Sequence, residues 1–255
     1  MIANYHTHTP RCRHASGTEE EYIQEAIKGG FHTLGFSDHT PYWFPEGYYT
    51  HMRMFPHQLP EYCECIRRLQ KEYAQQIRIL LGLEVEYYPA FFDDLMGRLR
   101  DAGIEYMILG QHWVGNEIDE PYSGSAVGSE AHLARYCDQT IEAMETGLFT
   151  YLAHPDLLYF TGEDRIYESH MRRLCKAAKG CDMPLELNLN GLQFQKNYPD
   201  ERFWRVAAEE GNTVILGADA HRTWAVNNVE QEAKAMEIVK KYDLPLIETV
   251  QLRKI

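Results

Sequence analysis

Histidine and acidic residues recur in this chain at one kind of place, the end of a short apolar run, and no other feature constrains the fold as strongly. Nine side chains share this placement: His6, His8, His14, His39, Glu84, His112, His154, Asp219 and His221. Almost every one follows a run with the composition of a β-strand, as in YMILGQH and TVILGADAH. A barrel of parallel strands gathers its functional side chains at the carboxyl ends of those strands. The pattern therefore predicts one site assembled from residues far apart in the sequence.

The segments between these runs have the periodicity of amphipathic helices. Thr18 is expected to cap the first helix, with Glu21 completing a capping box and Gly29-Gly30 ending it. The predicted strands lie in NYHTHT, Thr33–Phe36, IRILLGLEVEYY, YMILGQHW, YLAHPDL, LELNLNG, TVILGADAH and LPLIETV. The later helices are predicted over residues 57–75, 91–102, 130–146, 170–179, 200–210 and 229–242.

About seven β/α units emerge from this alternation. Strands separated by helices of this length pair in parallel, so the chain is expected to be an α/β protein with a distorted (β/α)7, TIM-like barrel. An open, doubly wound sheet is the alternative, but it would take its ligands from a switch point and not from nearly every strand.

Length and charge narrow the class of protein. With 255 residues, 44% of them hydrophobic, the chain suits one large domain spanning residues 1–255. The net charge of -13 disfavours a nucleic-acid partner and favours a small substrate. We find no apolar run of the roughly 20 residues that cross a bilayer and no signal peptide, so a cytoplasmic protein with no membrane partner is expected. The six cysteines have no C-x-x-C spacing and are expected to be reduced thiols. Oligomeric state is left open.

The donor types indicate metal chemistry. Imidazoles and carboxylates suit Zn, Mn or Fe, and a thiolate-poor set argues against a soft-metal or iron-sulfur site. Residues i and i+2 of a strand face the same way, so His6 with His8, and Asp219 with His221, can face one ion. Nine donors exceed the needs of a single ion, which predicts two or three divalent metal ions. Alternation places Glu84 and Glu86 on the same face, and the motif position G-x-E favours Glu84 as the ligand.

Five segments resemble one known family. HTHTPRCRHASG, GFSDHTP, LGLEVEYYP, YLAHPDL and GADAHR occur in the order and spacing of the polymerase-and-histidinol-phosphatase (PHP) family, and resemble most closely its monofunctional histidinol-phosphate phosphatases. The resemblance covers essentially the whole chain. It implies a distorted (β/α)7 barrel with a trinuclear metal centre. Motif by motif, it assigns His6, His8, Glu84 and Asp219 to one ion, Glu84, His112 and His154 to a second, and His14, His39 and His221 to a third.

The resemblance also implies a reaction, the hydrolysis of L-histidinol phosphate to L-histidinol and phosphate. Closely spaced ions lower the pKa of a bridging water and polarise the phosphoryl oxygens, so that a bridging hydroxide attacks phosphorus. Glu84, Asp219 and His221 are the residues expected to carry the catalysis, with Asp219 or a neighbouring histidine moving the proton to the leaving oxygen.

Substrate contacts are predicted at four residues: Arg11, Arg13 and Arg222 beside the ligands, and Asn190 on a strand that supplies none. For the arginines, a solvated surface charge is an equal alternative, and for Asn190 a structural hydrogen bond.

Two departures from the family pattern leave the substrate open. The relatives commonly have S-x-H where this chain has Gly110-Gln111-His112, and they often have a basic residue soon after H-x-D-L, whereas none occurs here before Arg165. A PHP phosphoesterase acting on another small phosphate ester or a nucleotide is therefore the runner-up. An amidohydrolase-type C–N hydrolase and a non-catalytic PHP module are further alternatives. The first has no need of a third ion, and the second typically loses ligands.

Overall fold

The computed structural model describes residues 1–255 as strands alternating with helices. The strands are β1 (Ala3–Asn4), β2 (Thr33–His39), β3 (Arg78–Val85), β4 (Tyr106–Leu109), β5 (Leu185–Asn188), β6 (Val214–Gly217) and β7 (Leu246–Ile247). The α-helices are α1 (Glu19–Lys28), α2 (Leu59–Glu72), α3 (Pro89–Ala102), α4 (Glu130–Glu145), α5 (Asp164–Gly180), α6 (Leu189–Gln193), α7 (Glu201–Glu210) and α8 (Val229–Tyr242). Short 3-10 helices cover Pro10–Cys12, Pro56–Gln58 and Thr223–Ala225.

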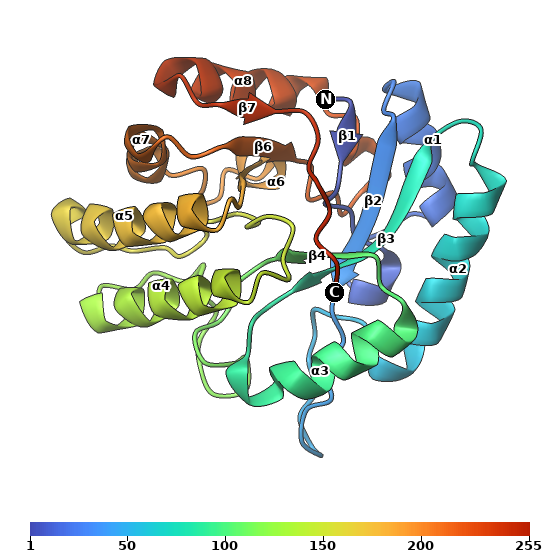
Figure 1. Ribbon diagram of the computed structural model, residues 1–255, viewed down its shortest axis with the longest axis horizontal. Helices are drawn as coiled ribbons and strands as arrows, with labels where there is room; N and C mark the ends of the chain where they lie inside the picture. The colour runs from blue at the N-terminus through green and yellow to red at the C-terminus, as the bar shows by residue number, and fades with distance from the viewer.

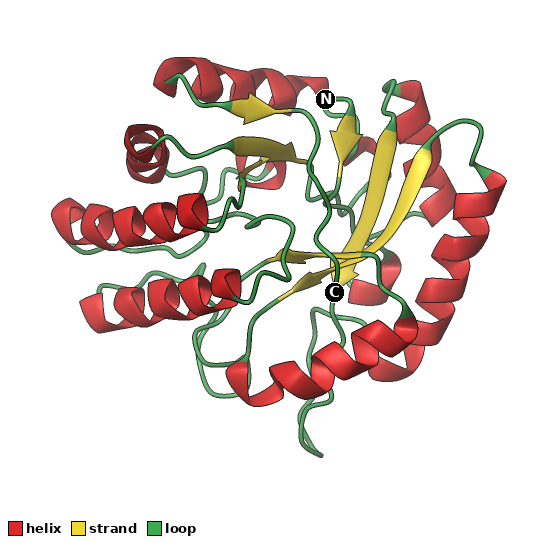
Figure 2. Ribbon diagram, in the orientation of Figure 1, coloured by secondary structure: helices red, strands yellow, loops and turns green.

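All strand pairs are parallel and form two sheets, with the orders β1-β2-β3-β4 and β5-β6-β7. Leu152 joins the sheets through bridges to Leu109 on one side and Leu185 on the other. Most helices lie outside the strands (Figure 1, Figure 2). The predicted distorted barrel of parallel strands is therefore confirmed.

A narrow seam closes the ring between the first and last parts of the chain. Thr7 forms a parallel bridge with Ala220, His8 N donates to Ala220 O at 3.0 Å, and Ala220 N donates to His6 O at 3.2 Å. Asn4 adds a side-chain bond, since its Oδ1 accepts from Ala218 N at 2.9 Å. The seam lies directly below the predicted ligands of both segments.

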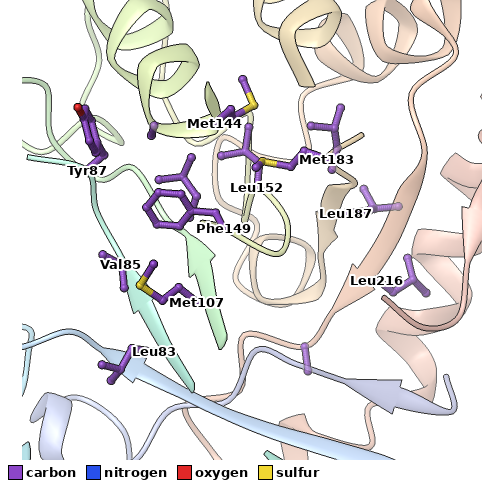
Figure 3. Packing of buried hydrophobic residues seen from close by; sticks show 14 of the residues in the cluster. Leu83, Val85, Tyr87, Met107, Met144, Phe149, Leu152, Met183, Leu187 and Leu216 are labelled. Atoms are coloured by element: carbon purple, nitrogen blue, oxygen red, sulfur yellow. The ribbon is translucent and has the colours of Figure 1, made fainter. Parts of the chain in front are cut away.

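Successive side chains of β3 point alternately toward the helices and toward the interior of the barrel. Leu81, Leu83 and Val85 point outward into a hydrophobic core of 59 buried residues that lies between strands and helices (Figure 3). Leu80 points inward and belongs to a second cluster of eight residues. At Gly82 an added Cβ would lie 2.2 Å from the Tyr106 ring, so the absence of a side chain makes room for that ring. The next inward position after Gly82 is Glu84.

The last residues of the chain run across the opposite, amino-terminal end of the barrel (Figure 1). Val250 and Leu252 pack against the inner cluster, and Val250 N donates to the Tyr5 hydroxyl at 3.4 Å. Arg253 N donates to Thr150 Oγ1 at 3.4 Å. This segment, residues 248–255, covers the apolar floor beneath the site.

Local structure differs from the sequence prediction in several places. The strands predicted in NYHTHT and LPLIETV are shorter than expected and cover only Ala3–Asn4 and Leu246–Ile247. YLAHPDL forms a single bridge residue, Leu152, because His154 has a φ of 28° and Pro155 has no N–H to donate. LELNLNG leaves the strand conformation at Asn188, whose side chain accepts from Gly191 N at 3.0 Å and caps α6. Helix α5 begins at Asp164, six residues before the predicted start. The Thr18–Glu21 capping box is confirmed.

No helix of this structure combines the length and the apolar character needed to span a membrane.

Candidate metal centre

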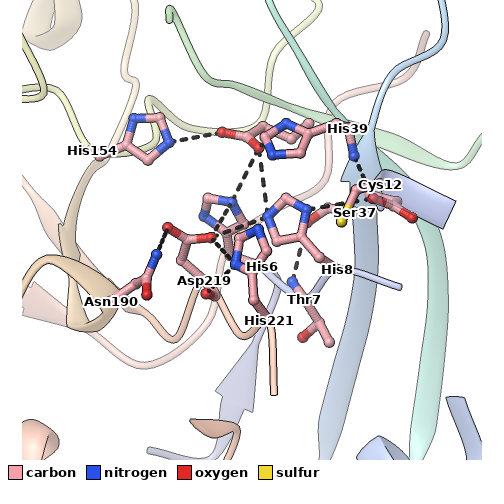
Figure 4. Close-up of polar contacts among 12 residues, drawn as sticks. His6, Thr7, His8, Cys12, Ser37, His39, His154, Asn190, Asp219 and His221 are labelled. Atoms are coloured by element: carbon pink, nitrogen blue, oxygen red, sulfur yellow. Dashed lines mark hydrogen bonds and ion pairs between the residues drawn. The ribbon is translucent and has the colours of Figure 1, made fainter. Parts of the chain in front are cut away.

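The structure brings all nine predicted donors to the carboxyl end of the barrel. Figure 4 labels His6, His8, His39, His154, Asp219 and His221 among them. His39 is the last residue of β2, Glu84 is the residue before the last of β3, and the other seven lie in the loops that follow β1, β4, Leu152 and β6. His154 and Asp219 have positive φ angles of 28° and 46°, a backbone conformation that non-glycine residues seldom adopt.

Glu84 lies at the centre of the group and is fully buried. Its Oε1 is 2.7 Å from His154 Nε2 and 3.5 Å from His112 Nε2. Its Oε2 is 2.9 Å from His39 Nδ1 and 3.5 Å from His6 Nε2. His8 Nε2 is 3.6 Å from the same Oε2, so one carboxylate faces five imidazoles from four different segments.

Asp219 occupies a second junction. Its Oδ1 is 3.1 Å from His8 Nε2 and 3.5 Å from His6 Nε2, while Oδ2 accepts from Asn190 Nδ2 at 2.9 Å. The same Oδ1 is 3.3 Å from His221 Nδ1. Asp219 thus lies between the imidazoles of His6 and His8 on one side and the imidazole of His221 on the other.

Several donor atoms in this cluster are buried without a hydrogen-bond partner. They are His6 Nε2, both ring nitrogens of His8, His39 Nδ1, Glu84 Oε2, His154 Nδ1 and His221 Nε2. An unpaired buried polar atom costs roughly 1–3 kcal/mol, so a cluster of them is not a stable end state for a folded protein. Divalent ions accept lone pairs from such atoms, and the residues present therefore fit a metal centre.

The grouping of ligand atoms agrees with more than one ion. Donor atoms lie within 4.8 Å of one another in several sets, among them His6–His8–Asp219, His6–Glu84–His154 and His14–His39–His221. A set of His8, Cys12 and His221 has the same spacing. Burial raises the pKa of the Cys12 thiol well above its ordinary value, which disfavours the thiolate needed for ligation.

The pKa values of the clustered imidazoles are shifted in two opposite directions. Burial lowers the pKa of His8, but the nearby carboxylates of Asp219 and Asp38, 3.1 and 3.5 Å from its ring nitrogens, outweigh burial and raise this pKa to about 9. Burial lowers the pKa of His39 well below its ordinary value, and it does the same at His221, where His8 adds to the effect. The carboxylate-rich half of the cluster therefore attracts cations, and the other half presents neutral imidazoles with free lone pairs.

Two buried carboxylates that the sequence did not single out as ligands contact the Nδ1 atoms of predicted histidine ligands. Glu186 Oε1 is 2.8 Å from His6 Nδ1, and Glu86 Oε1 is 2.8 Å from His112 Nδ1. An acid in an otherwise apolar strand was the available signal for Glu186. Asp38 Oδ1 lies 3.5 Å from His8 Nδ1 on the side away from Asp219 and Glu84, which face Nε2.

A cavity of about 510 Å³ opens above the donors. Its lining includes most of the predicted ligands together with Asn190 and Arg222, two of the predicted substrate contacts. The sequence did not single out several other lining residues: His51, Met52, Tyr122, Phe194, Lys196 and Tyr198. They lie in loops that the barrel brings together, so no local pattern marks them.

Arg11 and Arg13 lie outside this lining. Arg11 pairs with Glu19 and Glu61, and Arg13 donates to the Thr50 carbonyl and lies over the Phe55 ring. Both guanidinium groups are thus engaged away from the cavity.

Comparison with known proteins places the chain in a family. A family model described as the PHP domain matches residues 4–190, more than half of the sequence. The chain belongs to the PHP family. It is 33% identical to a probable histidinol-phosphatase of Deinococcus radiodurans, over 87% of this chain and 86% of that relative. It is 28% identical to a probable histidinol-phosphatase of Schizosaccharomyces pombe, over 87% of this chain and 81% of that one.

Among solved structures, this PHP protein is similar to histidinol phosphate phosphatase from Lactococcus lactis in complex with zinc, L-histidinol and phosphate. The TM-score is 0.74 at 20% identity, and the alignment covers 98% of this chain and 97% of the other. At that identity the likeness establishes the fold.

Gly110 and Gln111, which depart from the PHP pattern, both have structural roles here. A Cβ at Gly110 would lie 2.0 Å from Glu84 Oε1, so the glycine leaves room for the central carboxylate. Gln111 accepts from Tyr87 N at 3.0 Å and donates to Trp113 O at 2.6 Å, and it does not line the cavity.

Proposed function

We propose that this PHP protein is a metal-dependent phosphomonoesterase that hydrolyses L-histidinol phosphate to L-histidinol and phosphate. The cluster of unpartnered imidazole and carboxylate atoms at the floor of the cavity carries the proposal. The histidinol-phosphatases named above support the substrate. Residues 1–255 act in this proposal as one catalytic domain, and the cytoplasm, which supplies such metabolites, is its proposed location.

The donor set suits two or three divalent transition ions, with Zn, Mn and Fe all acceptable to imidazole and carboxylate ligands. The nine residues would hold them as the PHP pattern divides them: His6, His8, Glu84 and Asp219; Glu84, His112 and His154; His14, His39 and His221. Glu84 would be shared, in keeping with its contacts to imidazoles of all three sets.

Bound ions would lower the pKa of water and polarise the phosphoryl oxygens, which supplies the nucleophile and the activation that phosphate ester hydrolysis needs. The protein's own task is to position the substrate and to handle the proton. Asp219 and His221 both line the cavity, and we assign proton transfer to the leaving oxygen to one of these two. Asn190 holds Asp219 Oδ2 and so fixes the direction of that carboxylate.

Lys196 and Arg222 provide positive charge in the cavity wall. Arg222 Nη1 donates to the His14 and His221 carbonyls at 2.8 and 2.7 Å, which places its guanidinium beside the three-histidine set. Lys196 Nζ lies 3.0 Å from the Tyr198 hydroxyl. These two side chains are suited to phosphate oxygens and supply the basic charge that the segment after HPDL lacks.

One observation favours a second candidate substrate, a phosphate ester other than histidinol phosphate. The acids that line the cavity are Glu84 and Asp219, both among the proposed ligands, so the wall offers no further carboxylate to the ammonium group of histidinol phosphate. A more anionic ester, such as a nucleotide, would meet no repulsion there.

Phosphate release from a panel of esters tests both assignments. Protein purified with Zn, Mn or Fe is expected to cleave L-histidinol phosphate with kcat/KM of at least about 10⁴ M⁻¹s⁻¹, the low end for ordinary enzymes. A nucleotide or sugar phosphate that exceeds this value while histidinol phosphate falls well below it would replace the substrate. Cleavage of an amide or a lactone, with no phosphate ester turned over, would replace the phosphatase by an amidohydrolase-type enzyme.

A further inference from the structure

We propose that Glu186 is a positioning residue that sets the metal affinity of the His6 and His154 ligand sets, an inference that rests on the proposed metal centre. Glu186 is fully buried on β5, a strand that contributes none of the nine donors. Its ion-pair partner is a histidine, with no lysine or arginine in range. A buried carboxylate without a permanent cation is costly unless its neighbours satisfy it, so its contacts identify its task.

One carboxylate oxygen of Glu186 orients His6. Oε1 lies 2.8 Å from His6 Nδ1, and the Tyr151 hydroxyl donates to the same oxygen at 3.3 Å. A carboxylate at Nδ1 keeps the proton on that nitrogen and leaves the Nε2 lone pair free. His6 Nε2 is the atom that faces Glu84 and Asp219, 3.5 Å from an oxygen of each. Such support orients a ligating ring and raises its basicity.

The other oxygen of Glu186 holds the backbone at His154. Oε2 accepts from His154 N at 3.0 Å and from Asn188 Nδ2 at 2.8 Å. His154 has a φ of 28°, a conformation that costs of order 1–3 kcal/mol and needs outside support. The carboxylate therefore supports a side-chain ligand of one proposed ion and the backbone of a ligand of another.

The neighbouring strand makes room for this carboxylate. A Cβ at Gly217 on β6 would lie 1.8 Å from Glu186 Oε1, so any larger residue would displace it. Gly110 stands in the same relation to Glu84. Each of these two buried carboxylates thus lies over a glycine. Gly110 makes room for Glu84, the central ligand, and Gly217 makes room for Glu186.

Glu186 has no contact with the three-histidine set. His14 Nδ1 lies 2.9 Å from the Cys12 carbonyl and His221 Nδ1 lies 3.0 Å from the Asp219 carbonyl, and Glu186 contacts neither ring. The loss of the Glu186 charge should therefore weaken the ions held by His6 and His154 and spare the ion held by His14, His39 and His221.

Glu186→Gln is the test, because it preserves the shape of the side chain and removes its charge. Metal-free protein is titrated with Co²⁺ alone, with binding followed by visible absorption and stoichiometry by elemental analysis. We expect one or two equivalents to bind about 10- to 100-fold more weakly than in the wild type, the usual consequence of losing such a partner. One equivalent should keep its affinity.

Glu19→Gln is the matched control, because Glu19 is also a buried carboxylate but pairs with Arg11 and touches no ligand. It should bind Co²⁺ like the wild type. Unchanged binding in Glu186→Gln would overturn the proposal, as would equal weakening in both variants. If Glu186→Gln does not fold, Glu186→Asp retains the charge and withdraws it from His6 by one methylene, and wild-type binding by that variant would also overturn the proposal. Wild-type protein that binds no Co²⁺ would refute the metal centre itself.

Discussion

Replacing Arg53 by methionine should destabilise the fold strongly even when no metal is bound. Arg53 is fully buried and donates five hydrogen bonds, to both Glu86 oxygens, to Glu117 and to the Thr40 carbonyl. It joins the loop after β2 to the loop after β4, and through Glu86 it supports the ring of His112. Methionine fills a similar volume but leaves two carboxylates buried without a cation.

The expected loss follows from that geometry. Removal of one partner from a buried ion pair costs about 3–5 kcal/mol, and the upper end applies because Glu86 and Glu117 both lose their charge partner. Typical domains unfold with only about 5–15 kcal/mol, so the change should be visible in any denaturation curve. A second substitution, Glu117→Met, should recover part of the loss by removing one unpaired carboxylate.

Urea unfolding of the metal-free proteins, followed by circular dichroism, measures these differences. Arg68→Met is a suitable control, because Arg68 pairs with Glu20 and Glu72 on the surface with its side chain 53% exposed, and its loss should change the free energy of unfolding little. The reasoning would be refuted if Arg53→Met lost less than about 1 kcal/mol, the value typical of an ordinary surface ion pair. It would also be refuted if Glu117→Met deepened the loss in the double variant.

Three further outcomes are expected. Glu84→Ala should abolish phosphatase activity and remove at least one ion, because its carboxylate faces five imidazoles. Elemental analysis and phosphate release measure this, and an active, metal-replete variant would contradict it. Lys196→Ala and Arg222→Ala should each raise KM for the phosphate ester with the metal content unchanged, whereas wild-type kinetics in both would remove them from the substrate site. Deletion of residues 248–255 should lower Tm by several degrees, because Val250 and Leu252 pack against the inner cluster and a loss of about 1 kcal/mol shifts Tm by roughly 2–4 °C in a domain of this size. An unchanged Tm would show that this segment does not stabilise the barrel.

The sequence predicted that these nine side chains come together, because strand alternation and strand ends are local signals with a fixed spatial meaning. His6 and His8 share a face by period two, and the parallel arrangement carries Glu84 and Asp219 to the same end of the barrel as those imidazoles. The order of strands and helices followed from periodicity in the same way.

The lining of the cavity was less predictable, because adjacency in sequence does not fix the direction of a long side chain. Arg11 adjoins the ligand loop but is turned to Glu19 and Glu61, whereas Lys196, with no motif around it, lines the cavity. The strand predicted in YLAHPDL is reduced to a single bridge residue because His154 has a φ of 28°. No pattern in the sequence signals this backbone angle.

The narrow seam between Thr7 and Ala220 affects the order in which parts of the protein fold. Its two sides are separated by most of the chain, and contacts of such sequence separation form late because closing the intervening loop is entropically unfavourable. During synthesis, His6 and His8 must wait for nearly the whole polypeptide before they can meet Asp219 and His221. An ion bound across the seam favours the closed ring by RT ln(1 + [L]/Kd), so metal supply and completion of the fold become one equilibrium. Loss of metal would then lower the fraction of protein with a closed barrel as well as its activity.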